Sequence, residues 1–136
     1  MISTTPEFDA FVREHRWAVL TSLRGGGQPV SSVVAYACDG DELVVSTPGF
    51  TFKTKSIAKD PRVNLCVISN QEPFNFVAIE ANASVIRDDV KADTLKVFDN
   101  IAATGYPKPD DLDGWLASQQ RVILRLSPER VHGVIR

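Results

Sequence analysis

The stretch STPGFTFKTKSIAKDPRVNLCV, residues 46–67, joins two apolar segments through a loop of small residues and a short lysine-rich segment. The β-forming run at residues 43–45 stops at residues 46–49, which are turn formers. A second apolar run follows Pro61, because proline disfavours helix in the residue before it. The pattern predicts a strand, a short helix and a strand, with hydroxyls and free backbone amides gathered ahead of the helix.

The expected short helix carries positive charge where a bound anion would stabilise it. Thr51 or Thr54 can cap it, and Lys53 and Lys55 then lie in its first turn. Lysine opposes the helix dipole at an N-terminus, so a bound dianion would resolve this placement. A solvated basic turn explains the same residues, because lysines are usually exposed. Spacing alone leaves an anion site and a solvated turn equally open.

Composition predicts one domain over residues 1–136. The hydrophobic fraction of 43% and charged fraction of 24% are ordinary for a soluble globular protein. A formal net charge of -2 argues against a nucleic-acid partner. Cys38 and Cys66 have neither metal-ligand spacing nor a histidine cluster beside them, so we expect core thiols and no metal. The absence of a long apolar run predicts no membrane contact, and a cytoplasmic location is expected.

The rest of the chain reads as short strands with helices inserted. A glycine turn at residues 25–27 joins a predicted hairpin, and Asp88 or Asp89 is expected to cap the helix that follows. Ser127 and Pro128 are expected to form a turn between the last two strands. The fold class expected is mainly β with α insertions, a six- to seven-stranded antiparallel closed barrel, with a sandwich as the alternative. The predicted helices are 6–14, 51–59, 90–102 and 110–118, and the predicted strands are 17–23, 29–37, 42–46, 62–69, 74–86, 121–126 and 130–135.

Four stretches resemble the split-barrel flavin and deazaflavin oxidoreductases, the pyridoxamine 5'-phosphate oxidase-like superfamily. They are AVLTSLRGGGQPVSSVVAY at 18–36, ELVVSTPGFTFKTKSIAKDPRVNLCV at 42–67, PFNFVAIEANASVI at 73–86, and RVILRLSPERVHGVIR at 121–136. The second is the most specific, because its lysines and its Asp-Pro-Arg-Val sequence follow the family's phosphate-binding pattern. The resemblance covers nearly the whole chain and implies an FMN-binding split barrel.

The resemblance also implies where a cofactor lies. Lys53 and Lys55 would hold its phosphate, with Ser46 and Thr47 as further donors and Ser56 where the family often has asparagine. Lysine lacks the planar fork of the family's arginine, so the grip on the phosphate would be looser. The strand residues Ser31, Ser32 and Val33 would face the ring, although plain strand packing explains them too.

In this family the cofactor lies between two subunits, so the resemblance implies a homodimer. Phe74, Phe76 and Trp115 are the candidate walls from the partner subunit, although aromatic residues in a small protein more often belong to its core. Ala81 and Asn75 depart from the family's usual residues, which predicts a different substrate pocket.

The resemblance implies an oxidoreductase that transfers hydride between reduced deazaflavin F-420 and a small conjugated substrate, with FMN as the alternative cofactor. The C-terminal hairpin resembles the deazaflavin branch more, and the C-terminus lacks the extended arginine-rich ending of pyridoxamine phosphate oxidases, which makes that specific activity less expected. The competing hypotheses are a non-catalytic flavin, deazaflavin or haem binding or storage protein and, less favoured, a nucleic-acid adaptor. No catalytic residue is identified, because His15 and His132 both have structural explanations.

Overall fold

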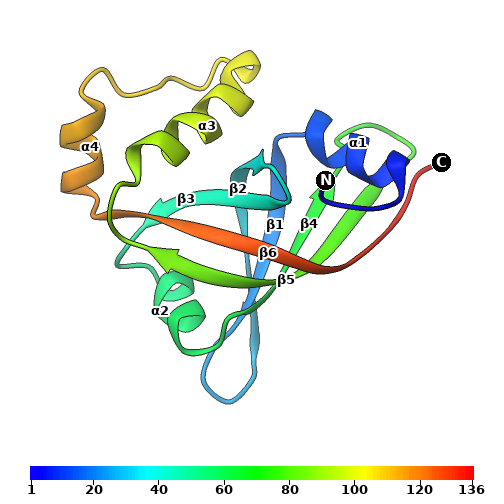
Figure 1. Ribbon diagram of the computed structural model, residues 1–136, viewed down its shortest axis with the longest axis horizontal. Coiled ribbons are helices and arrows are strands. Elements are labelled where there is room, and N and C mark those ends of the chain that lie inside the picture. Colours follow the sequence, from blue (N-terminus) through cyan, green and yellow to red (C-terminus); the bar gives the residue numbers. More distant parts are fainter.

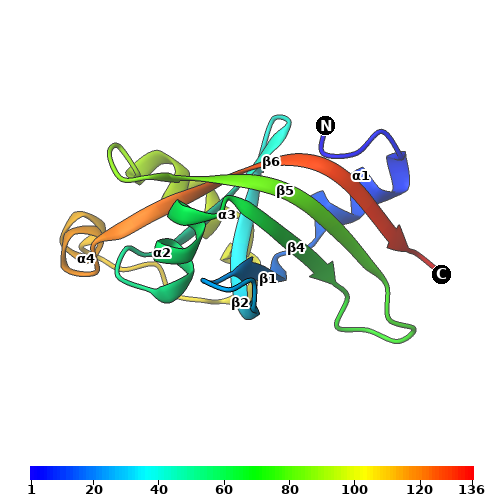
Figure 2. The same ribbon diagram turned by 90° about the horizontal axis from the view of Figure 1, so that it is seen from below.

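The computed structural model describes residues 1–136, and six strands form its core (Figure 1). Figures 1 and 2 both place the N-terminal helix α1 at the end of the barrel near the chain termini, and α4 at the opposite end. The elements are α1 (Pro6–Glu14), β1 (Trp17–Leu23), β2 (Pro29–Asp39), β3 (Glu42–Pro48), α2 (Phe52–Lys59), β4 (Arg62–Ile68), β5 (Phe76–Ile86), α3 (Lys91–Ile101), the 3-10 turn η1 (Ala102–Thr104), α4 (Leu112–Ser118) and β6 (Arg121–Val134).

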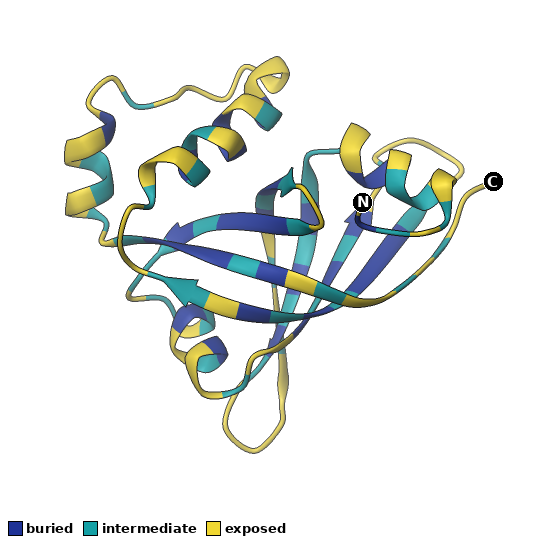
Figure 3. Ribbon diagram, in the orientation of Figure 1, coloured by how far each residue is buried: buried dark blue, intermediate teal, exposed yellow.

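The strands close an antiparallel barrel in the order β1-β2-β3-β6-β5-β4. Side chains alternate between the interior and the surface along β1 and β4, as expected for strands with one buried face (Figure 3). Leu20, Val45, Leu65, Ile79 and Leu124 are at most 1% exposed and belong to one apolar cluster inside the barrel. The structure therefore confirms the barrel, and the sandwich alternative is wrong.

The barrel is split between β2 and β3. Residues 29–35 of β2 pair with β1, but β2 pairs with β3 only from Tyr36 to Asp39. β3 pairs with β6 along residues 43–48, and its residues 46–48 have no partner in β2. The two strands thus diverge from the Tyr36–Val45 pair onward. Residues 29–35 of β2 and 46–48 of β3 each have one edge with no strand beside it. Backbone N–H and C=O groups on such edges are available to a ligand.

The predicted turn at Ser127 and Pro128 is wrong, because β6 runs without a break from Arg121 to Val134. The register against β5 shifts between Glu80 and Ala81, so a β-bulge accommodates the extra residue. Proline lacks an N–H for the ladder, and a bulge tolerates it. The two predicted C-terminal strands are therefore one, and the barrel has six strands.

The predicted capping of α3 by Asp88 or Asp89 is also wrong. Asp89 has a left-handed backbone with φ of 53°, and Val90 occupies the N-cap position without a side-chain hydrogen bond. Val90 packs instead against the apolar cluster between α3 and the barrel. Burial of an apolar side chain takes precedence here over a polar cap.

Charged residues fasten α3 to the barrel. The Arg125 guanidinium in β6 donates to Asp39 at 2.9 Å, to Glu42 at 3.1 Å and to Asp93 of α3 at 2.9 Å. Lys96 of α3 also reaches Asp39, at 3.1 Å. Hydrogen bonds from Arg125 and Lys96 hold the pKa of the Asp39 carboxyl below its ordinary value.

No helix in the structure combines the length and apolar character needed to span a bilayer.

Gly49 allows the loop after β3 to lie against the end of α4. Its N–H donates to the Gln120 carbonyl at 2.8 Å, and a Cβ on Gly49 would lie 2.4 Å from that oxygen. We expect Gly49→Ala to lower the free energy of unfolding by about 1 to 3 kcal/mol, the range for overpacking. Urea unfolding of the variant measures this loss.

Gly25→Ala is the matched control, because nothing lies within 4 Å of a Cβ at Gly25. We expect it to change the free energy of unfolding by less than about 0.5 kcal/mol, as for most surface substitutions. Equal stability of the two variants would contradict the close packing at Gly49.

Candidate functional site

A cavity of about 340 Å³ opens where β2 and β3 diverge. The free stretches of β2 and β3 form one side, and residues of α3, α4 and the loop between them form the other. Nine of its fifteen lining residues are hydrophobic, including Trp17, Val33, Phe98 and Trp115. The polar residues gather at the ends of β3 and β6. The cavity therefore suits a ligand that is apolar over most of its length and polar at one end.

Two cations form the polar end of this cavity. Lys53 comes from the first turn of α2, and Arg121 opens β6 opposite Pro48. The Arg121 guanidinium donates to Ser46 Oγ at 3.0 Å and to Gln119 Oε1 at 2.9 Å, and it lies 4.3 Å from the centre of the Trp115 ring. Neither cation has a carboxylate oxygen within 4.0 Å. All the partners of Arg121 are neutral. They fix the position of the guanidinium group but do not neutralise its positive charge.

Burial makes both positive charges unfavourable in the free protein. Removal from water lowers the pKa of Lys53, and the nearby Arg121 lowers it further. Burial likewise lowers the pKa of Arg121. Two half-buried cations without a counter-charge are costly unless an anion joins them. The electrostatics of this corner favour a bound anion over a solvated basic turn.

Two polar atoms at the same corner have no hydrogen-bond partner. Thr47 is only 2% exposed, and its Oγ1 is unpaired, as is Nε of Arg121. Buried polar groups in native proteins are nearly always paired, so unpaired ones need an explanation. Both atoms are fully covered in the free protein, so an oxyanion would accept hydrogen bonds from them only after the side chains around them shift. This is the observation in the cavity that points most directly to a ligand.

Threonine hydroxyls fix the start of α2 and with it the position of Lys53. Thr51 is the N-cap, and its Oγ1 accepts from the Thr54 amide at 3.4 Å. The hydroxyls of Thr51 and Thr54 both donate to the Pro48 carbonyl, each at 3.1 Å. The cap is therefore Thr51, and Thr54 is a fully buried support for the loop.

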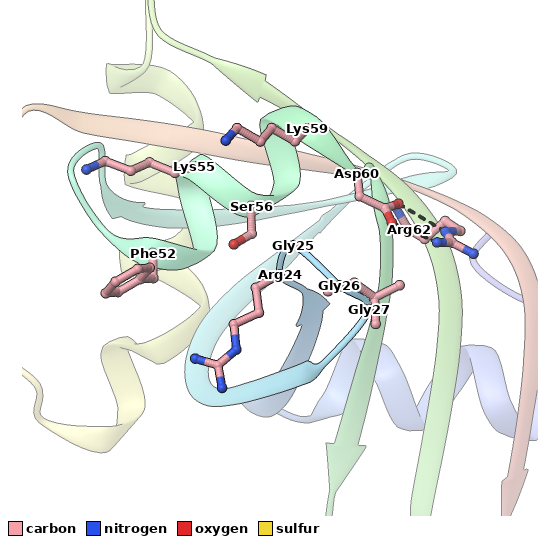
Figure 4. Close-up of a pocket in the computed structure, with 11 residues that line it drawn as sticks. Arg24, Gly25, Gly26, Gly27, Phe52, Lys55, Ser56, Lys59, Asp60 and Arg62 are labelled. Carbon is pink, nitrogen blue, oxygen red and sulfur yellow. Dashed lines mark hydrogen bonds and ion pairs between the residues drawn. The ribbon is translucent and has the colours of Figure 1, made fainter.

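The structure brings together some of the phosphate residues predicted from the sequence and separates others. Ser46, Thr47 and Lys53 line the cavity. Lys55 is exposed and lines a different groove, between α2 and the glycine turn, and Ser56 points towards that turn (Figure 4). Residues two positions apart on a helix do not share a face, so Lys53 and Lys55 face different hollows.

The predicted ring-binding residues of β2 are likewise divided. Val33 lines the cavity and is 73% exposed. Ser31 is exposed on the outer side, and its hydroxyl lies 2.8 Å from that of Thr21 across the β1–β2 pair. Ser32 is half-buried and does not line the cavity. Alternation along the strand puts Ser32 on the opposite face from Ser31 and Val33, and Ser31 shares the face of Val33 but lies nearer the glycine turn and outside the cavity lining.

Of the three predicted aromatic walls, Trp115 lines the cavity of its own chain. Phe74 lies in the loop between β4 and β5 and is 66% exposed. Phe76 begins β5 and meets His132 edge-on, with 6.3 Å between the ring centres. Neither phenylalanine lines the cavity of its own chain, so their expected role against a partner's cofactor remains a prediction.

Sequence reasoning missed Arg121, Gln119 and Trp17 as cavity residues. Arg121 is 68 positions after Lys53 in the chain, and only the β3–β6 register brings it beside Ser46 and the loop after β3. One signal was available: Arg121 opens a strand directly after a helix, where a side chain lies at the rim of a barrel.

Comparison with known proteins identifies a matching family and several solved structures with the same fold. Residues 4–135 match the family described as pyridoxamine 5'-phosphate oxidase. The fold is similar to that of an F-420 reductase, with 21% identity, 91% of this chain and 94% of that chain covered, and a TM-score of 0.74. No curated protein sequence matches the chain.

Two further solved structures have the same fold. A FAD-binding protein from Mesorhizobium loti has 18% identity, 96% and 94% of the two chains covered, and a TM-score of 0.72. HutZ, a haem storage protein from Vibrio cholerae, has 19% identity, 94% and 92% covered, and a TM-score of 0.70. These likenesses confirm the fold expected from the sequence, and the family match confirms the resemblance.

The uncompensated charge of Lys53 predicts a measurable stability effect. We expect Lys53→Met to raise the melting temperature of the free protein at pH 7, because the variant removes a desolvated cation beside Arg121. The folded-state pKa of Lys53 lies below its ordinary 10.5. The folded protein therefore loses this proton first, and the wild type regains stability as the pH rises between the two values. Thermal unfolding from pH 7 to 10.5 should show the gap between the two proteins narrowing.

Lys55→Met serves as control, because Lys55 is an exposed lysine of the same helix and does not line this cavity. It should leave the melting temperature at pH 7 unchanged. A lower melting temperature for Lys53→Met would mean that the ammonium group is favourably placed in the free protein.

Proposed function

The chain belongs to the pyridoxamine 5'-phosphate oxidase family, and on this basis we propose that it is an oxidoreductase that binds F-420, or alternatively FMN, in the cavity between β2 and β3. The proposed reaction is hydride transfer between the reduced cofactor and a small conjugated substrate. The observation that carries the proposal is the pair of cations, Lys53 and Arg121, which have no carboxylate partner. The unpaired hydroxyl of Thr47 lies at the same end of the cavity.

The residues present fit the phosphate of such a cofactor. Lys53 and Arg121 would neutralise its charge, and Ser46 and Thr47 would supply hydroxyl donors. Arg121 provides the planar fork that the lysines of α2 lack, which suits the bidentate binding of phosphate oxygens. The structure thus supplies from β6 the guanidinium that the sequence pattern of α2 does not contain.

The remaining surface of the cavity fits a flat ring. Trp17, Val33 and Phe98 offer apolar contact, and the free edge of β2 offers backbone groups for the polar edge of the ring. When bound, a flavin or deazaflavin ring supplies the hydride chemistry. The chain's own part is to hold the phosphate, align the ring along β2 and exclude water from its apolar face.

A binding or storage protein without turnover is the second candidate, favoured by the fold shared with a haem storage protein. Of the residue types that ligate haem iron, the cavity lining includes one tyrosine, Tyr106, and no histidine, cysteine or methionine. His15 stacks on Phe11 at 3.8 Å, and His132 lies against Phe76. These positions support a flavin-type cofactor over haem. Turnover with a substrate panel separates oxidoreductase from storage protein.

We further propose that two copies of the chain form a homodimer that encloses the ring. Val33 is 73% exposed and Ile68 is 40% exposed, although both are apolar. They line a shallow hollow with Trp17 and Val19 that adjoins the cofactor cavity at Trp17 and Val33. Exposed apolar surface continuous with a ligand site is typical of an interface. A second copy on this surface would cover the open side of the cavity.

We call Lys53 and Arg121 the phosphate clamp. If they hold the cofactor phosphate, removing either side chain should weaken cofactor binding. We expect Lys53→Ala and Arg121→Ala each to weaken binding of F-420 or FMN by about 1 to 3 kcal/mol, the range for a charge-assisted hydrogen bond. Fluorescence titration or calorimetry measures the affinities. Lys108→Ala, an exposed lysine outside the cavity, is the control and should bind as the wild type does. Unchanged affinity in both Lys53→Ala and Arg121→Ala would show that the cofactor phosphate does not bind at this corner.

The dimer predicts an effect of charge on the exposed face of β2. Val33→Asp should convert the dimer to a monomer in sedimentation experiments, because a carboxylate in an apolar interface is costly to desolvate. Ala10→Asp, on the exposed face of α1, should leave the dimer intact. A wild-type protein that sediments as a monomer at micromolar concentration would contradict the proposed assembly.

A further inference from the structure

Residues 106–119, which comprise α4 and most of the connection before it, are fastened weakly to the rest of the molecule. Figure 1 shows α4 beside α3, outside the barrel and joined to α3 by an extended connection. From Ala102 to Gln120, the only buried residue is Leu112. No backbone–backbone hydrogen bond joins residues 106–119 to another part of the chain. We call this segment the α4 cover.

A residue with a left-handed backbone stands at each end of the α4 cover. Gly105 has φ of 79° and Gln120 has φ of 49°. Glycine adopts this conformation freely, whereas a glutamine in it is uncommon and strained. The Gly49 amide donates to the Gln120 carbonyl at 2.8 Å, which fixes this end of the cover to the loop after β3. Hinged segments move by changes of φ and ψ at a few such terminal residues.

A small apolar cluster and one ion pair hold the α4 cover against α3. Leu112 packs with Phe98 and Ile101 in a cluster of three buried residues, separate from the barrel core. Lys91 Nζ, at the start of α3, lies 2.9 Å from Asp113 Oδ1, and both side chains are more than half exposed. Exposed ion pairs contribute little to stability. Segments with so few buried contacts open locally while the rest of the fold stays intact.

The α4 cover occupies Arg121 of the phosphate clamp. The Trp115 ring lies 4.3 Å from the guanidinium carbon, and Gln119 Oε1 accepts a hydrogen bond from it at 2.9 Å. Nε of Arg121 is covered and has no partner. Trp115 and Gln119 both belong to the cover, and both are neutral. An oxyanion that binds Arg121 must displace them, so the cover has to move before the ligand reaches its full set of donors.

We propose that the α4 cover opens about Gly105 and Gln120 and gates the entry of ligands to the phosphate clamp. The inference rests on the anion site of the proposed function, but on neither the identity of the cofactor nor turnover. In the closed state Trp115 and Gln119 hold Arg121 in place of a ligand. A bound oxyanion favours the open state, because Arg121 then exchanges neutral partners for a charged one.

Thiol labelling of the ligand-free protein tests whether the cover opens. Ile101 and Val97 lie one turn apart in α3 and are 3% and 4% exposed. Ile101 packs against the cover, whereas Val97 packs against the barrel. We expect the new thiol in Ile101→Cys to react with a maleimide at least about 10-fold faster than that in Val97→Cys, because local opening uncovers only the first. Peptide mapping separates these thiols from Cys38 and Cys66.

The urea dependence of labelling excludes a trivial difference in global stability between the two variants. Local opening exposes little surface, so the rate for Ile101→Cys should change little in low urea, while that for Val97→Cys should rise steeply. Equal rates with equal urea dependence would show that both positions are reached only by unfolding of the whole chain, and would overturn the cover.

The ion pair between Lys91 and Asp113 supplies variants that loosen the cover without touching the cavity lining. Asp113→Asn and Lys91→Gln remove opposite charges but break the same pair. Each should raise the labelling rate of Ile101→Cys by about 2- to 5-fold, and the two together no further. Asp110→Asn is the control, because Asp110 is an exposed acid beside α4 without an ion pair. It should leave the rate unchanged, and an equal rise in this control would show a general charge effect and refute the latch.

Association kinetics connect the opening to ligand entry. Stopped-flow mixing with FMN and with F-420 measures the association rate, which should rise in Asp113→Asn and Lys91→Gln by the same factor as the labelling rate. Faster labelling with unchanged association would refute the gate and leave the proposed function standing. If neither cofactor binds the wild type, the proposed function fails and the gate fails with it, even where labelling shows that the segment opens.

Discussion

The pairing of β3 with β6 is the constraint on which the candidate site depends. Because β3 leaves β2 after the Tyr36–Val45 pair and continues along β6, a gap opens in the barrel wall. The same pairing places Arg121 opposite Pro48 and beside Ser46. The hydrogen bond from Gly49 to Gln120 continues this contact into the loop that precedes α2. One register therefore produces both the cavity and its positive end.

The charge distribution shows how the fold divides its polar residues between stability and binding. Arg125 satisfies its charge with three carboxylates and fastens α3 to the barrel. Arg121, four residues earlier on the same strand and also facing outwards from the barrel, receives only neutral partners. Functional sites commonly retain such unfavourable groups, at some loss of stability. The contrast between the two arginines is the physical reason for assigning them different roles.

Local signals in the sequence predicted the strands, the hairpin turns and the short helix of residues 52–59, because these depend on neighbouring residues. Thr51, as one of two candidate caps, and the lysines of α2 were identified for the same reason. Arg121 was not, since its place beside Ser46 results from strand register between distant segments. The break expected at Ser127 and Pro128 failed because a bulge absorbs the proline. Lys55 was grouped with Lys53 by spacing, but side-chain direction on the helix separates them.

The stacking of Trp115 over Arg121 has a spectroscopic consequence. The chain contains two tryptophans, Trp17 and Trp115, and both line the cofactor cavity. All of the protein's indole emission therefore originates at the walls of one hollow, with one of the two rings directly against a guanidinium group. A change in the surroundings of that hollow is therefore expected to alter the whole of the protein's tryptophan fluorescence, without any added label.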